Sequence, residues 1–203
     1  MSLRRIAIFT TSRAEFGILS PLIQQIKNTK GFQPLLFVGG AHLHKKYGKT
    51  LKEIEKYKFK IHSKFDYISN ISGSQNLAAS LGKATIQVSK IFKKFKFDYV
   101  CLLGDRYELI SIVSNSILFK KPIMHIGGGD ITSGSMDNQI RNLITKSSHL
   151  HFASCKEYKT NIINMSESAW RVHSVGSLSV DRILSMPRLN KSKIFKKFKL
   201  TKD

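Results

Sequence analysis

Short apolar segments alternate with longer segments of helical periodicity along most of this chain. Runs of five to seven residues rich in Ile, Val, Leu and Phe predict strands at residues 4–9, 33–38, 59–65, 99–103, 122–126, 149–153 and 170–175. Apolar spacings of three and four predict helices at residues 16–27, 49–57, 76–95, 106–119, 138–147 and 155–165. The alternation predicts an α/β fold, a doubly wound, Rossmann-like parallel sheet with helices on both faces.

The pattern weakens after residue 176. Residues 179–186 carry one further helical pattern, which ends at Pro187, and the following NKSKIFKKFKLTKD is basic with little to pack against. We therefore expect one domain over residues 1–176, with a helix and a basic tail over 177–203. SKIFKKFKL at 192–200 nearly repeats SKIFKKFKF at 89–97, which indicates biased composition more than a repeat fold. A basic amphipathic helix that touches a membrane stays open as an alternative.

Composition is typical of a folded protein, since 41% of the 203 residues are hydrophobic and 13 are Phe. No apolar run approaches the ~18 residues that span a membrane, and the N-terminal apolar segment is too short for a signal peptide. Cys101 and Cys155 match no metal spacing. His149 and His151 flank one apolar residue without a third ligand nearby, so the argument for a metal site there is weak. We expect a cytoplasmic protein without a metal site.

The formal net charge of +21 has more than one interpretation. A nucleic-acid or anionic-membrane partner is the first. However, the lysines are dispersed, and Ile91, Phe92 and Phe95 among them fit the buried face of a helix. A positive field also steers anionic small molecules. We expect no specific nucleic-acid partner and favour an anionic substrate.

Two apolar runs stop at glycine and then present an aspartate. DYVCLLGDRYE at 98–108 gives Gly104 and Asp105, and KPIMHIGGGD at 121–130 gives three glycines and Asp130. In open parallel sheets, ligands bind beyond the carboxyl ends of the strands. The pattern thus predicts a shared reaction centre with room for a ligand at the glycines. The alternative for Asp130 is a flexible turn in which it caps a helix.

Arginines accompany these carboxylates. Arg13 lies in TTSRAEFG at 10–17, where the dinucleotide fingerprint GxGxxG is absent and a helix N-terminus favours a phosphate. The alternative is an ion pair of Arg13 with Glu15. Arg106 is next to the first aspartate, where it either binds ligand or holds the turn. Asp137 and Arg141 share a helix face, which alone indicates a salt bridge. Together these groups suit general acid/base chemistry on a phosphorylated substrate.

Several motifs resemble a known family. SRAEFG at 12–17, LLGDRYE at 102–108, PIMHIGGGDITSG at 122–134, DNQIRNLITKSSHLHF at 137–152 and VHSVGSLSVD at 172–181 are similar to the UDP-N-acetylglucosamine 2-epimerase family. The similarity is greatest to the hydrolysing enzymes of sialic and legionaminic acid synthesis, and it covers nearly the whole chain in order. It implies the first of two Rossmann-like domains in a glycosyltransferase-B-like arrangement, with the active site between them.

The resemblance also implies an activity: removal of UDP from UDP-N-acetylglucosamine or a diacetamido relative, UDP-N,N'-diacetylbacillosamine, and addition of water to give a manno-configured sugar. It implies no metal or redox cofactor, and two kinds of protein partner stay open, a second copy of the chain or a separately encoded second half. The implied acid/base set is Asp105, Asp130 and Asp137, supported by Arg141. The implied substrate contacts are Arg13, Gly104, Arg106, Gly128 and Gly129.

This chain departs from the family pattern near the expected site. Where the family typically has HGGE, residues 127–130 read GGGD, so Gly127 replaces a histidine and Asp130 a glutamate. The missing methylene retracts the carboxylate by about 1.5 Å. Asn138 and Asn142 stand where the family usually has Glu and His. The chain also ends where the family enters its second domain, so it is either part of a longer or split protein or a non-catalytic relic that binds a sugar nucleotide or a partner.

Overall fold

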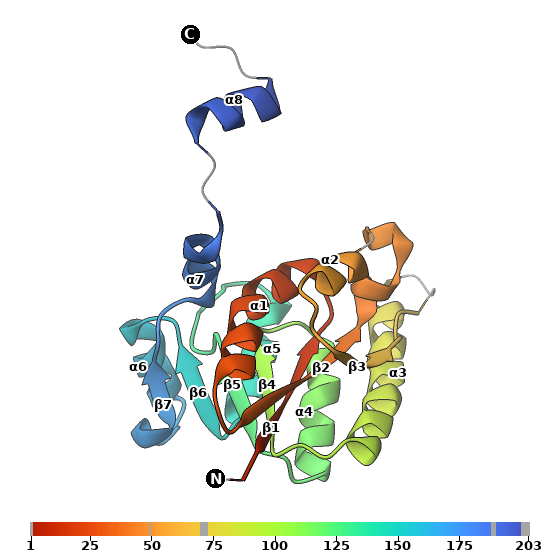
Figure 1. The fold of residues 1–203 in the computed structure, drawn as a ribbon. Coiled ribbons are helices and arrows are strands. Elements are labelled where there is room, and N and C mark those ends of the chain that lie inside the picture. Colours follow the sequence, from red (N-terminus) through yellow and green to blue (C-terminus); the bar gives the residue numbers. More distant parts are fainter. Residues whose placement is uncertain (1, 49, 70–72, 188–189, 200–203) are drawn as a thin grey trace.

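A computed structural model of the chain describes residues 2–48, 50–69, 73–187 and 190–199. Its centre is a parallel sheet in which seven strands follow the order β3-β2-β1-β4-β5-β6-β7 (Figure 1). The strands are β1 (Arg4–Thr10), β2 (Phe32–Gly39), β3 (Ile61–Phe65), β4 (Tyr99–Leu103), β5 (Ile123–Ile126), β6 (Leu150–Ala153) and β7 (Val172–Ser174). Each lies within a segment predicted to be a strand, apart from one-residue shifts at the ends, so the strand predictions are confirmed.

The strand order places a switch point beside the first strand. The chain begins in β1, moves outward to β3, and then crosses back to β4 on the other side of β1. From β4 it moves outward again to β7. The two halves therefore diverge between β1 and β4, and the crevice at the carboxyl ends of diverging strands is where such sheets bind ligands.

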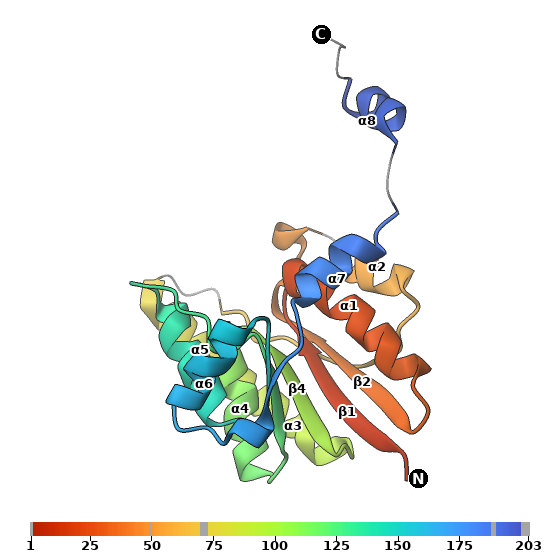
Figure 2. The same ribbon diagram turned by 90° about the vertical axis from the view of Figure 1, so that its left-hand side faces the viewer.

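Helices cover both faces of the sheet, as predicted. Figure 2 shows α1, α2 and α7 on one side of the strands and α3, α4, α5 and α6 on the other. Their bounds are α1 (Arg13–Asn28), α2 (Leu51–Lys56), α3 (Gly73–Lys94), α4 (Leu109–Leu118), α5 (Met136–Lys146), α6 (Lys156–Asn164), α7 (Leu178–Ser185) and α8 (Lys191–Phe198). Short 3₁₀ turns are η1 (Gly40–Leu43), η2 (Lys45–Tyr47) and η3 (Ala169–Arg171).

Among the helix starts that differ from the prediction, those of α1 and α4 have local reasons. Helix α1 begins at Arg13, three residues before the predicted start, because the Ser12 hydroxyl caps it by accepting from the Glu15 N–H at 3.4 Å. Helix α4 begins at Leu109, three residues after the predicted start, because residues 104–108 form the turn that leaves β4. Both differences matter for function, since they set the turns at the carboxyl edge.

The basic tail forms a short helix rather than irregular chain. The Asn190 side chain caps α8 by accepting from the Lys193 N–H at 2.9 Å. Figures 1 and 2 both show α8 standing away from the sheet and its helices. No helix among the described residues is long and apolar enough to cross a membrane.

A cluster of aromatic rings fills the core between the sheet and α3. The ring of Phe9, on the central strand, lies 5.0 Å from Phe37, 5.9 Å from Phe65 and 6.2 Å from Phe92, measured between centroids. Phe9 has no exposed surface. Offset and edge-on ring pairs of this kind add to the free energy gained by burial, so this cluster fixes β1 against β2 and β3.

Replacing Phe9 by Ala should therefore lower the free energy of unfolding by ~3–5 kcal/mol, because it empties the centre of this cluster. Urea unfolding measures the change. Phe198→Ala is the matched control: this ring is 61% exposed, and we expect a change below ~0.5 kcal/mol. Equal effects of the two substitutions would show that the Phe9 cluster is not the core.

Candidate active site at the carboxyl edge of the sheet

An arginine on α5 holds the aspartate that follows β4. The Arg141 guanidinium is buried and donates through Nη2 to the Asp105 carboxylate in a very short ion pair. Its other terminal nitrogen, Nη1, donates to the Asp130 carbonyl at 2.9 Å and to the Thr132 hydroxyl at 3.2 Å. Gly104, just before the aspartate, has a φ of +77°, a conformation that favours glycine. Arg141 thus ties together the turns after β4 and β5.

The spacing of Asp137 and Arg141 does not produce the helix salt bridge that their sequence positions alone indicate. Arg141 turns toward Asp105 instead. Asp137 is exposed in the first turn of α5, where its backbone N–H donates to the Ser135 hydroxyl at 3.1 Å. The structure therefore brings Asp105, Asp130 and Arg141 into direct contact and leaves Asp137 at the rim.

The glycines before Asp130 are explained by close packing more than by room for a ligand. A Cβ on Gly128 would lie 2.8 Å from the Thr145 hydroxyl, and one on Gly129 would overlap the Tyr158 carbonyl. Only at Gly127 are the nearest atoms at ordinary contact distance, 3.8 Å away. Packing therefore requires the absence of a side chain at two of the three glycines, Gly128 and Gly129.

The Asp130 carboxylate does not cap a helix, because the N-cap of α5 is Ser135. Instead the Asp130 carboxylate acts on Tyr158 of α6, whose pKa it raises. Asp130 is held through its carbonyl, which accepts from Arg141. Its carboxylate stays near the edge of the sheet rather than in a helix cap.

The two other predicted cations each have a carboxylate partner. Arg13 is at the start of α1 and 70% of its side chain is exposed; its Nε donates to Glu53 on α2 at 3.0 Å, so the expected alternative of a pair with Glu15 is wrong. Arg106 donates from Nε to buried Glu108 at 2.6 Å. Arg106 therefore holds its own turn, while 44% of its side chain stays exposed at the edge.

The buried carboxyl of Glu15 lies under the β1–α1 turn and was not predicted from the sequence. Glu15 accepts from the Thr11 N–H at 2.7 Å and from the Thr11 hydroxyl at 3.1 Å. Burial raises the pKa of Glu15 to about 7. A nearby histidine, His42, lies 3.1 Å from the Thr10 hydroxyl, and burial lowers its pKa to about 4. These groups shape the turn that presents Arg13.

A usable signal for such buried carboxyls exists in the sequence. Glu15 stands four residues before Leu19 on the apolar face of α1, and Glu108 stands four residues before Ile112. In both cases the leucine or isoleucine is buried, and so is the carboxylate. An acidic residue in register with an apolar face therefore indicated burial, although its partners could not be read from the chain.

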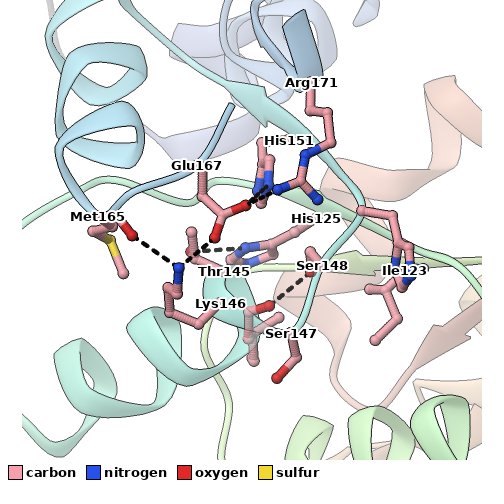
Figure 3. Close-up of polar contacts among 12 residues, drawn as sticks. Ile123, His125, Thr145, Lys146, Ser147, Ser148, His151, Met165, Glu167 and Arg171 are labelled. Atoms are coloured by element: carbon pink, nitrogen blue, oxygen red, sulfur yellow. Dashed lines mark hydrogen bonds and ion pairs between the residues drawn. The ribbon is translucent and has the colours of Figure 1, made fainter. Parts of the chain in front are cut away.

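A third buried carboxylate anchors the end of α5. Glu167 accepts from Lys146 Nζ at 2.7 Å, from Arg171 Nη2 at 2.6 Å and from His151 Nε2 at 3.2 Å (Figure 3). Burial acts to raise the pKa of Glu167, but the Lys146 hydrogen bond and the surrounding charges hold it below its usual value. Because Lys146 ends α5, this cluster fixes the helix that carries Arg141.

The two histidines considered as metal ligands do not share an environment. His151 is fully buried on β6, whereas His149 is exposed and accepts from the Ile123 N–H at 3.2 Å. Among the described residues, no group of three His, Cys, Asp or Glu side chains could hold a metal ion. Cys101 is a buried core residue, as expected, and burial raises its pKa to about 12.

The edge therefore combines two carboxylates with exposed cations. Asp105 is oriented by a buried guanidinium, which fixes the direction of its carboxylate. Arg13 and Arg106 lie after β1 and β4, the strands that border the switch point. A carboxylate base next to cations that can receive an anionic leaving group is the minimum needed for proton removal coupled to loss of a phosphate.

Replacing Arg141 by Met should lower the free energy of unfolding by ~2–4 kcal/mol, because it leaves the Asp105 carboxylate partly buried without its guanidinium. The matched control is Arg13→Met, which removes a largely exposed ion pair and should cost below ~1 kcal/mol. Urea unfolding of both variants measures the two changes in the free energy of unfolding. A loss below ~1 kcal/mol for Arg141→Met would mean that the pair does not support the edge.

Stability should also depend on the ionisation of Glu15. Its pKa is about 7 in the folded protein and 4.5 normally, so the folded state binds the extra proton between these values and is stabilised as the pH falls through them. The free energy of unfolding of the wild type, minus that of Glu15→Gln, should increase by ~1–3 kcal/mol from about pH 8 to about pH 5. Urea unfolding at both pH values measures it, and a constant difference would refute the buried carboxyl.

The chain is similar in sequence to known proteins. The family model for UDP-N-acetylglucosamine 2-epimerase matches residues 24–202. A GDP/UDP-N,N'-diacetylbacillosamine 2-epimerase (hydrolyzing) of Campylobacter jejuni is 38% identical over 100% of this chain and 53% of that protein. Polysialic acid biosynthesis protein P7 of Escherichia coli is 33% identical over 97% of this chain and 50% of that protein.

Solved structures show the same fold. A UDP-GlcNAc 2-epimerase from Neisseria meningitidis, bound to UDP-GlcNAc, superimposes with a TM-score of 0.76 at 18% identity, over 98% of this chain and 51% of that one. The chain spans about half the length of the curated relatives that it matches. The match of the family model over most of the chain, together with the shared fold, shows that this chain belongs to the UDP-N-acetylglucosamine 2-epimerase family.

Proposed function

We propose that this chain is the N-terminal half of a hydrolysing UDP-sugar 2-epimerase that acts on UDP-N-acetylglucosamine or UDP-N,N'-diacetylbacillosamine. The observation that carries the proposal is the Arg141 guanidinium, which binds both Asp105 and the Asp130 backbone at the carboxyl edge of the sheet. Membership of the epimerase family supports the substrate class, since relatives named for these two sugars match the chain.

The proposed reaction has two steps. A carboxylate removes the proton at C2 of the sugar while the bond from C1 to the diphosphate oxygen breaks, which releases UDP and leaves a double bond between C1 and C2. Water then adds its hydroxyl at C1 and a proton returns to C2 from the opposite face. Because the C2 proton is only weakly acidic, cations must stabilise the leaving diphosphate as the proton departs.

The residues of the edge divide between these tasks. Asp105 and Asp130 are the proposed acid/base pair, with Asp137 at the rim as a third member, and Arg141 orients the first two. We assign the diphosphate to the exposed cations and to the backbone near the two turns, namely Arg13, Arg106, Gly104, Gly128 and Gly129. Gly128 and Gly129 act through their main-chain atoms, because their side-chain positions are filled by Thr145 and Tyr158.

The proposed organisation follows from the span of the match. Residues 1–176 form the first Rossmann-like domain, and residues 177–203 lead toward a second domain, which the relatives' additional length would supply. A second copy of this chain or a separately encoded second half are the partners to test. The product is a free manno-configured amino sugar for sialic or legionaminic acid synthesis in the cytoplasm. Neither a metal nor a redox cofactor takes part in the proposed chemistry.

Replacing Asp105 by Asn should reduce UDP release at least ~100-fold, because the amide cannot accept the C2 proton. The assay incubates each sugar nucleotide with the chain, alone and mixed with the C-terminal half of the Campylobacter jejuni relative. Asp98→Asn is the matched control at the opposite edge of the sheet, where Asp98 pairs with Arg4, and should change release less than ~3-fold. Absence of UDP release by the wild type under both conditions would overturn the catalytic proposal.

A non-catalytic module that binds a sugar nucleotide or a partner is the second candidate. The observation that favours it is the loop at residues 127–130, where Gly127 and Asp130 stand in place of the family's histidine and glutamate. Calorimetric titration with UDP separates the two candidates. Binding without release of UDP from either sugar nucleotide supports the module, whereas turnover supports the enzyme.

A further inference from the structure

A buried histidine on β5 contacts the turn that carries Asp105. His125 has no exposed surface, and its Nε2 lies 2.9 Å from the Gly104 carbonyl oxygen. Its other ring nitrogen, Nδ1, lies 3.1 Å from the hydroxyl of Thr145 on α5 (Figure 3). The imidazole therefore bridges the β4 turn and α5 beneath the carboxyl edge.

The partners of His125 determine which nitrogen carries the proton. A carbonyl oxygen only accepts hydrogen bonds, so Nε2 must donate to Gly104. Burial lowers the pKa of His125 to about 4, and a neutral ring has one N–H only. Nδ1 is then an acceptor, and the Thr145 hydroxyl donates to it. The Gly104 carbonyl thus selects the tautomer, and the Thr145 hydroxyl completes it by donating to Nδ1.

The same helix also holds the side chain of this turn. Arg141 and Thr145 are one helical turn apart on α5, and both are buried. Arg141 binds the Asp105 carboxylate, while Thr145 acts through His125 on the carbonyl of the preceding residue. Helix α5 therefore fixes Asp105 at two points, one through its side chain and one through its backbone.

The glycine loop lies directly on this pair. A Cβ on Gly128 would stand 2.8 Å from Thr145 Oγ1, closer than real contacts allow, and a tight 3.0 Å from His125 Nδ1. Gly128 therefore packs directly on the hydrogen-bonded pair of the histidine and the threonine. The pair thus contacts both the turn before Asp105 and the loop before Asp130.

We propose that His125 and Thr145 are positioning residues, which set the placement of the Asp105 carboxylate relative to the loop of Asp130. Neither residue touches the substrate in this proposal. It rests on the proposed function for its catalytic consequence, but the placement of the turn is a property of the chain alone. A misplacement of about 1 Å can cost ~10²-fold in rate, which gives the pair its importance.

The test replaces the Thr145 hydroxyl with a methyl group. Thr145→Val keeps the volume and removes the donor, whereas Thr145→Ser keeps the donor and loses the methyl, so the two variants form a matched pair. The first measurement is an NMR spectrum of the full chain labelled with ¹⁵N, which reports the tautomer of His125 and the amide resonances of Gly104 and Asp105. The second is the rate of UDP release from UDP-N-acetylglucosamine.

We expect the wild type and Thr145→Ser to show His125 protonated at Nε2 with similar amide resonances at Gly104 and Asp105. Thr145→Val should shift those two amides and lower kcat ~10- to 100-fold with KM changed less than ~3-fold. His125→Gln, which keeps a donor near Gly104, should retain more activity than His125→Leu.

The proposal is overturned if His125 carries its proton on Nδ1, or if Thr145→Val leaves both amides where they are in the wild type. It is also overturned if an active Thr145→Val enzyme keeps the wild-type kcat. If the wild type releases no UDP, the catalytic proposal fails on its own, and the amide shifts and the tautomer still decide whether the pair positions the turn.

Discussion

The ion pair between Arg141 and Asp105 is the interaction on which the candidate site depends. A buried ion pair carries a large desolvation cost, and replacement of both partners by hydrophobic residues often gives equal or greater stability, whereas removal of one partner destabilises. What the pair does supply is a fixed orientation of the Asp105 carboxylate. The guanidinium uses its remaining donors on the Asp130 carbonyl and the Thr132 hydroxyl, so a single side chain fixes the ends of two neighbouring strands. The Glu167 cluster at the other end of α5 keeps that helix in place.

The fold could be predicted from the chain because its signals are local. Five- to seven-residue apolar runs bounded by helical patterns predict buried parallel strands, and the strands of the structure lie in those runs. Helix ends were less predictable, since Ser12 caps α1 earlier than the apolar spacing indicates. The tail was harder still, because α8 depends on a cap at Asn190 and not on packing against the sheet.

The site could be predicted only in part. The rule that ligands bind at the carboxyl ends of strands placed Asp105, Asp130 and the three arginines correctly at one edge. Partners were not predictable, because a pair such as Arg141 with Asp105 joins residues 36 positions apart. The spacing of Asp137 and Arg141 suggested a salt bridge within α5, but Arg141 pairs with Asp105 instead. His125 was not predicted for the same reason, since its partners come from the turn after β4 and from α5.

Contacts within this chain alone hold the turns at the carboxyl edge of the sheet. The turns after β1, β4 and β5 are each held by buried groups, namely Glu15, the pair of His125 and Thr145, and Arg141. Order of this kind reduces the entropy that a ligand must remove on binding. Gly127, where this chain departs from the family pattern, is the glycine among residues 127–129 at which an added Cβ would have the most space.

The most direct test of this account is an NMR titration of the ¹⁵N-labelled chain with UDP. We expect the amide resonances of Arg13, Gly104, Asp105 and residues 127–130 to shift together with one dissociation constant, while those of α3 and α8 stay unchanged. Shifts confined to the basic helix α8 or to the surface of α3 would contradict the account, as would a spectrum that does not respond to UDP at all.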